Sequence, residues 1–310
     1  MAVLEQAIIF LVLMIVGLYA RRIKLITSEN QPQISGLVVN IAYPAIILSG
    51  ALTPSEKVSG QELVMAFGAS LALLALVMLA GWLIVRLMKF EQSLRGIVIV
   101  MTVFTNIGFM GVPMIKGIYG TDALIYITIF LIPFNLLFFS FAVAAISGRK
   151  QQSSQSLLIR FKLFFNNGMI ACFLAILFYF VDVPIPSVIR NTVDMLGSMT
   201  APLAMILMGS FLVDVNWIDV FVDKKAFLYF FLKMLVVPVV VVWILDQFID
   251  NRVLLGVCMA AVAAPCGNVI ALLAAIYNKK AYPIAVKYIA LSTLGCVATM
   301  PIAFALAGLG

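Results

Sequence analysis

Long apolar runs alternate with short polar links along almost the whole chain. These runs are too long for the strands of a barrel, and about 20 apolar residues are enough to cross the hydrocarbon core as a helix. The pattern therefore predicts an all-α polytopic membrane protein with ten membrane-spanning helices. The predicted spans are 4–20, 33–52, 61–88, 94–116, 122–147, 164–182, 187–213, 225–247, 252–277 and 282–308.

Two of these spans contain residues that disfavour a continuous helix. The fourth contains Asn106, Gly108, Gly111 and Pro113, and the ninth contains Pro265, Gly267 and Asn268. Each glycine weakens a helix by about 1 kcal/mol relative to alanine. Proline removes a backbone donor and clashes with the carbonyl four residues earlier. One such break is typical of a kinked membrane helix. Two breaks roughly half a chain apart favour paired broken spans that cross at the binding site of a transporter.

The basic residues indicate how the spans are oriented. Fourteen of the 20 lie in alternate links, beginning with Arg21, Arg22 and Lys24. Cytoplasmic loops are enriched in Lys and Arg, so this alternation supports ten spans with both termini outside the plasma membrane. No basic residue precedes the first span, so we expect it to be retained rather than cleaved as a signal peptide.

The longest polar link, 148–163, divides the chain into two sets of five spans, 1–147 and 164–310. Because five is odd, the second set enters the membrane from the opposite side, and the sets are predicted to be inverted repeats. In this register the broken fourth and ninth spans correspond. Pro44 in the second span and Pro202 in the seventh also fall at comparable places, as candidate hinges.

Composition narrows the function classes. The chain is 64% hydrophobic and 11% charged, whereas soluble domains carry about 25% charged residues. The basic residues are spread over separate links, so we expect no nucleic-acid partner. Histidine is absent, which excludes His-based catalysis and His-ligated zinc or haem. We expect no metal or cofactor, and interpret the four cysteines as small apolar packing residues.

Several of these residues together resemble the auxin efflux carrier family, in its short prokaryotic branch. The residues that carry the resemblance are Asn40, Tyr43, Pro44, Asn106, Gly108, Gly111, Pro113, Ala201, Pro202, Ala264, Pro265, Cys266, Gly267 and Asn268. That family includes plant auxin carriers and bacterial malonate or malate permeases, and related breaks occur in bile acid:sodium symporters. The resemblance implies a scaffold of spans 1, 2, 6 and 7 and a moving core of spans 3–5 and 8–10. It also implies a crossover of spans 4 and 9, Asn40 facing the substrate path, and a homodimer through scaffold helices.

The breaks suggest how a substrate is held. A helix N-terminus carries partial positive charge and unpaired N–H groups, so half-helices ending at mid-membrane can bind a carboxylate. The amides of Asn106 and Asn268 can donate to such an anion or satisfy freed backbone groups. Asn135, beside Pro133, has two open interpretations: it lines the cavity, or it satisfies the carbonyl that Pro133 frees.

Two lysines lie well inside spans. Lys233 and Lys287 are candidates for an electrostatic role at the crossover, while Lys287 is also close enough to a span end for its ammonium to reach the interface. No carboxylate falls at mid-span, which disfavours a proton pump or a cation-only antiporter. Asp194 is interpreted as a residue at the start of a helix.

The leading hypothesis is a secondary active transporter of a small organic anion, either a dicarboxylate or an indole-type weak acid, working by elevator-like alternating access. No Walker motif supplies ATP energy. The alternatives are a sodium-coupled symporter of the bile acid or pantothenate type and, more remotely, a channel. An intramembrane enzyme is disfavoured, because the spans carry no paired Asp, no His and no Ser–Lys pair.

Overall fold

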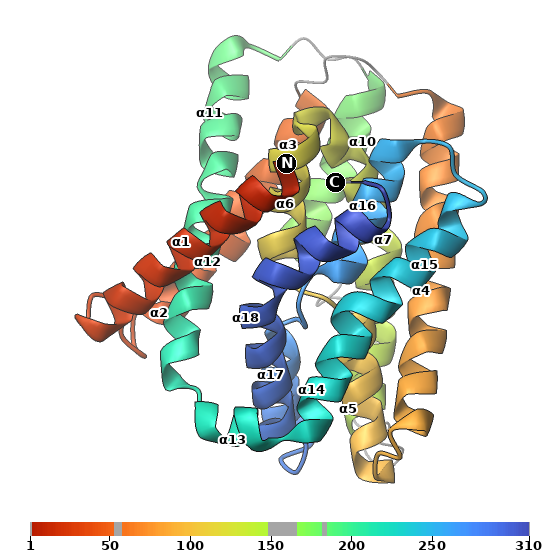
Figure 1. The fold of residues 1–310 in the computed structure, drawn as a ribbon. Helices are drawn as coiled ribbons and strands as arrows, with labels where there is room; N and C mark the ends of the chain where they lie inside the picture. The colour runs from red at the N-terminus through yellow and green to blue at the C-terminus, as the bar shows by residue number, and fades with distance from the viewer. Residues whose placement is uncertain (1, 53–57, 148–165, 182–184, 310) are drawn as a thin grey trace. The chain divides into compact units, whose positions relative to one another are not determined.

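The computed structural model describes residues 2–52, 58–147, 166–181 and 185–309. The named elements within these ranges are helices (Figure 1). The predicted link 148–163 lies outside the described residues.

Seven helices in the described ranges are long and apolar enough to cross a membrane. They are Ala2–Arg22, Gln31–Leu52, Gly60–Leu87, Thr121–Ser147, Ser187–Asp214, Lys224–Asp246 and Tyr282–Leu306. Four shorter apolar helices, Gln92–Val103, Ile107–Tyr119, Asn167–Val181 and Arg252–Ala263, fall in the remaining predicted spans, and the helix Val269–Tyr277 completes the ninth. The protein is therefore an all-α polytopic membrane protein, as predicted. The count of ten spans and their inverted repeat stay predictions.

The described chain falls into two compact units. Unit 1 comprises 1–67, 108–132 and 165–214, and unit 2 comprises 68–107, 133–164 and 215–310. Three of the boundaries fall inside elements: α4 (Gly60–Leu87), the π-helix η2 (Ile107–Gly111) and α7 (Leu124–Leu137).

The other helices belong to one unit each. Unit 1 contains α1 (Ala2–Arg22), α2 (Gln31–Leu37), η1 (Val38–Ala42), α3 (Tyr43–Leu52), α6 (Val112–Tyr119), η3 (Thr121–Ala123), α10 (Asn167–Val181), α11 (Ser187–Ser198), α12 (Thr200–Phe211) and η6 (Leu212–Asp214). Unit 2 contains α5 (Gln92–Val103), η4 (Phe138–Ala142), α8 (Val143–Ser147), α13 (Trp217–Val222), α14 (Lys224–Phe231), η7 (Leu232–Val236), α15 (Val237–Asp246), α16 (Arg252–Ala263), α17 (Val269–Tyr277) and α18 (Tyr282–Leu306).

Unit 1 is built on the close pairing of α1 with α12 (Figure 1). A Cβ at Gly17 would lie 1.9 Å from the carbonyl oxygen of Ile206, and one at Gly209 would lie 1.9 Å from that of Met14. Each glycine therefore lets the facing backbone approach closer than any side chain would permit. Small residues have this role where membrane helices associate, because lipid supplies no hydrophobic force to drive them together.

Three π-helical turns come directly before a proline. The elements η1, η2 and η7 are followed by Pro44, Pro113 and Pro238, each in the first turn of the next α-helix. Proline cannot donate to the carbonyl four residues earlier and clashes with it, and the wider π turn accommodates that lost bond. Pro202 acts differently: α11 ends at Ser198, the residue whose carbonyl it would crowd, and α12 begins at Thr200.

Candidate functional site

The two breaks predicted from the sequence meet inside unit 2. The helix α5 ends at Val103 and α16 ends at Ala263, and an antiparallel bridge joins Thr105 to Cys266. The N–H of Asn106 donates to the carbonyl of Pro265 at 2.7 Å. The N–H of Gly267 donates to the carbonyl of Phe104 at 3.0 Å. Each break therefore satisfies backbone groups that the other exposes, which hydrocarbon would leave unpaired.

Pro265 explains why α16 stops where it does. A residue before proline is pushed out of the α region, and Ala264 is extended, with φ −58° and ψ 148°. Proline also leaves the carbonyl of Ala261, four residues earlier, without its helical donor. The hydroxyl of Thr105 supplies that donor at 2.7 Å. The N–H of Cys266 is likewise redirected, to the hydroxyl oxygen of Ser292 at 3.1 Å.

The side chain of Lys233 caps the C-terminus of α16. Its ammonium donates to the carbonyl of Val262 at 3.3 Å and to that of Ala264, and lies 3.4 Å from the sulfur of Met234. The residue is 1% exposed, although it lies near the middle of its span. Among the described residues it forms no ion pair. A buried charge without a counter-ion needs other compensation, and here the dipole and the free carbonyls of a helix C-terminus supply it.

Helix ends of both signs meet at the crossing. Two helix C-termini, those of α5 and α16, end there, and each carries about half a negative charge. Two helices start there, at Ile107 and at Val269, and each N-terminus carries about half a positive charge. The ammonium of Lys233 adds a full positive charge at the end of α16.

A buried polar cluster supports the second break, and no sequence pattern predicted it. The hydroxyl of Tyr229 lies 3.2 Å from that of Thr102 and 3.7 Å from the sulfur of Cys266. The ring of Tyr229 stacks on that of Tyr288, with centroids 4.9 Å apart. These residues look like ordinary packing positions in the sequence. Only the approach of α5, α14 and α18 brings them to the break.

Asn106 and Asn268 both lie at the crossing and both are half-buried. Asn106 takes part in the bridge through its backbone N–H. Asn268 is the residue from which α17 starts, and its side chain forms no capping bond there. The N–H of Ile270 donates to the carbonyl of Gly267 at 3.1 Å, so backbone rather than a side chain closes the first turn of α17.

The remaining residues of the first break belong to unit 1. Gly111 precedes α6, and Pro113 lies in its first turn. Gly108 faces the ring of Tyr43, since a Cβ there would lie 3.3 Å from the ring carbon Cε2. On the other edge of the ring, a Cβ at Gly168 would lie 2.9 Å from Cε1. The Tyr43 ring therefore lies between Gly168 on α10 and Gly108 on η2.

Asn40 lies one turn before Tyr43, on η1, and is exposed. Its side-chain oxygen accepts from the amide of Asn167 at 3.0 Å, and its own amide donates to the carbonyl of Gly36. The pair joins η1 to the start of α10. Asn167 has no signal in the sequence because its link to Asn40 is formed only by folding.

Asn135 lies on α7 in unit 2 and is half-buried. The helix continues through Pro133 without a break. Neither interpretation of Asn135, cavity lining or satisfaction of a freed carbonyl, is decided by this geometry.

Lys287 lies in a second environment, away from the break carbonyls. Its ammonium bonds the carboxylate of Asp223 at 3.0 Å, and Asp223 also caps α14 by accepting from the N–H of Ala226. Partial burial alone would raise the pKa of Asp223. The bonds from Lys287 and from the backbone outweigh burial, so this pKa lies below its ordinary value. Of the two candidate lysines, Lys233 is the one that the structure places on the break.

The interpretation of Asp194 as a helix-start residue is wrong. The helix α11 begins at Ser187, so Asp194 lies in its third turn. Its carboxylate forms an ion pair with Lys116, near the end of α6, at 2.7 Å. The partner is distant in the sequence, so neither residue signals the pair.

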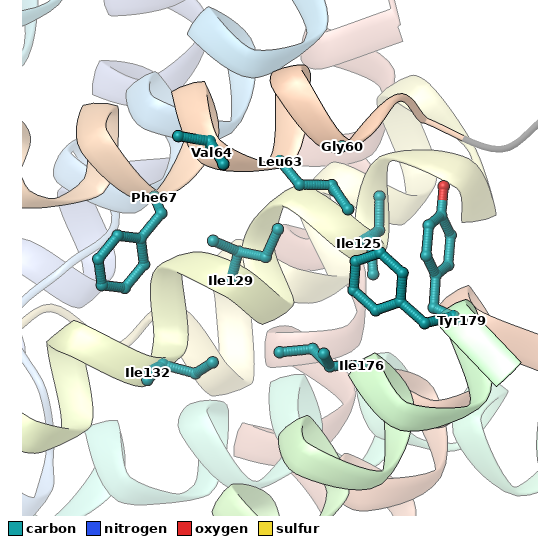
Figure 2. Close-up of a pocket in the computed structure, with 10 residues that line it drawn as sticks. Gly60, Leu63, Val64, Phe67, Ile125, Ile129, Ile132, Ile176 and Tyr179 are labelled. Carbon is teal, nitrogen blue, oxygen red and sulfur yellow. The ribbon is translucent and has the colours of Figure 1, made fainter.

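Unit 1 also contains an apolar cavity of about 290 Å³ between α4, α7 and α10 (Figure 2). Its lining includes Val64, Phe67, Ile129 and Ile176, with the Tyr179 hydroxyl as a polar group. That hydroxyl accepts from the N–H of Val58. The cavity offers no charge to an anion and is not part of the candidate site.

The described residues hold no cluster of three or more His, Cys, Asp or Glu side chains that would suit a metal ion. The fold defines a polytopic membrane protein, and the site is a pair of interrupted helices joined at their breaks. The chain belongs to the membrane transport protein family, that of the auxin efflux carriers, whose family model matches residues 2–304. No curated protein sequence matches the chain. The protein is therefore a membrane transporter.

Proposed function

We propose that the protein is a secondary active transporter of a small organic anion, with the carboxylate bound at the crossing of the two breaks. The observation that carries the proposal is the reciprocal pairing of Asn106 with Pro265 and of Gly267 with Phe104. This pairing holds two interrupted helices together while α17 starts without a side-chain cap. The lysine at the break adds a full positive charge, which favours a carboxylate.

The proposed architecture has ten spans in two inverted repeats, with both termini outside the plasma membrane. Seven long apolar helices, four shorter ones and the helix Val269–Tyr277 together support this count. The scaffold is formed by spans 1, 2, 6 and 7, and the core by spans 3–5 and 8–10. The core carries the crossing past the scaffold by an elevator-like movement. A homodimer through the scaffold is part of the same proposal.

The first experiment is a thermal-shift screen of mono- and dicarboxylates on purified protein, with and without sodium and at two pH values. A ligand that binds only the folded protein raises its melting temperature. Hits are then tested for counterflow in proteoliposomes. We expect at least one carboxylate to bind and to show trans-stimulation.

Three results would decide against the proposal. Binding and transport of only uncharged solutes would overturn the anion site. Flux without trans-stimulation would indicate a channel. Carboxylate uptake that requires sodium would favour the sodium-coupled symporter instead.

The breaks themselves are tested by changing Pro113 and Pro265 together to Ala. We expect this double variant to insert into the membrane but to lose transport, because both half-helices can then extend through their breaks. Full activity of an inserted double variant would remove the breaks as the site.

A further inference from the structure

We propose that Lys233 is a built-in cation, whose ammonium occupies the position at the end of α16 that a sodium ion would otherwise take. The assignment deepens the proposed function, on which it rests for its role in transport. It predicts that this transporter works without sodium, and that removing the lysine exposes a latent sodium site.

The geometry at Lys233 is that of a cation among oxygen ligands. The ammonium bonds the carbonyls of Val262 and Ala264, on either side of the last residue of α16. Unwound carbonyls and the C-terminal ends of half-helices are the groups that coordinate coupling cations in transporters with broken helices. Here those groups are already bound by a side chain.

Lys233 lies on a helix with a local irregularity. It is the second residue of the π-helix η7, and the helix that follows η7 has Pro238 in its first turn. Insertion of a lysine at mid-span is unfavourable, so a position of this kind requires a compensating role. The carbonyl end of α16 supplies the partner, and the buried position excludes solvent.

The test compares wild-type protein with Lys233→Ala in melting experiments in detergent. Sodium chloride is compared with choline chloride at equal ionic strength and without any organic anion, so the readout does not depend on transport. We expect the wild type to melt at the same temperature in both salts. Lys233→Ala should melt lower in choline and rise by about 5 °C in saturating sodium, because sodium can enter the vacated position.

Lys287→Ala is the matched control, since it removes the other lysine inside a span. We expect it to lose stability with its ion pair to Asp223 but to gain no sodium response. A sodium response shared equally by both variants would contradict the assignment, and so would a Lys233→Ala protein that folds but does not respond to sodium.

If Lys233→Ala does not fold in choline, the melting temperatures of the wild type in the two salts still test the proposal. Sodium-specific stabilisation of the wild type would overturn the proposal, because the position would not then be filled by the lysine. Recovery of folded Lys233→Ala only when sodium is present during purification would support it. If no carboxylate is transported, these melting results still stand, and only the link to anion transport is lost.

Discussion

The backbone N–H of Asn106 donates to the carbonyl of Pro265 at 2.7 Å, joining two helix breaks that are far apart in the sequence. Proline gives α16 its end, and the same residue offers its carbonyl to the other break. A membrane helix cannot leave backbone groups unpaired in hydrocarbon. The crossing solves this problem for both helices at once.

Replacing Pro265 with Ala should reduce transport by about tenfold or more, equivalent to at least about 1.4 kcal/mol. Alanine allows α16 to continue through 264–266, which withdraws the carbonyl that Asn106 uses. The measurement is initial uptake into proteoliposomes at matched protein density. Pro301→Ala is the control, because Pro301 lies inside the continuous helix α18. Equal losses in both variants would contradict a specific role for the break.

Gly267→Ala tests how tightly the two breaks approach. A Cβ at Gly267 would lie 3.1 Å from the carbonyl oxygen of Phe104, so the bridge must open slightly. We expect a loss of about 1–3 kcal/mol in unfolding free energy together with reduced uptake. Gly68→Ala is the control, since nothing lies within 4 Å of a Cβ there, and alanine favours a helix by about 1 kcal/mol. Unchanged melting of Gly267→Ala would show that the bridge is loose.

The pairing of α1 with α12 should be sensitive to single methyl groups. Gly17→Ala and Gly209→Ala each place a Cβ 1.9 Å from a facing backbone oxygen, which no rotamer change can relieve. We expect each to destabilise the protein by about 3 kcal/mol, since the helices must separate. Thermal melting in detergent measures this loss. The double variant should lose less than the sum, because one separation relieves both contacts.

Asp223→Asn should destabilise the protein in a pH-dependent way. The folded state lowers the pKa of Asp223, so its contribution is complete above the unfolded value of about 4 and is lost as the pH falls through the folded value. Asparagine keeps a capping oxygen for Ala226 and removes only the charge that faces Lys287.

At pH 7 we expect a loss of about 1 kcal/mol, shrinking below pH 4. Melting of wild type and variant across this range measures it. A difference that stays constant with pH would mean that the ion pair contributes nothing.

Much of the fold follows from the one-dimensional pattern. The apolar runs predicted the membrane helices closely, since a span is a local property of about 20 residues. The breaks at 104–106 and 264–267 were also predicted, because glycine and proline act on their own backbone. The interpretation of Asp194 failed for the opposite reason: its partner, Lys116, is remote in the chain.

The residues of the candidate site likewise fall into those that the sequence predicted and those that only the structure revealed. Asn106, Pro265, Gly267 and Asn268 were found from the sequence, because each lies in a local irregularity. Thr105, Ser292 and Tyr229 were not, since hydroxyls are common in membrane helices and their donors and acceptors come from other helices. The two lysines could not be ranked until one was found on the break and the other on Asp223.

The sequence by itself determined that the chain is a membrane protein, where its helices run and where two of them are interrupted. These are properties of neighbouring residues and of the hydrocarbon that surrounds them. Only the tertiary structure decided that the interruptions bond to each other, and that Lys233 rather than Lys287 holds the end of α16. Those outcomes depend on which distant backbone groups become each other's partners, and the residue pattern along a single helix does not encode that choice.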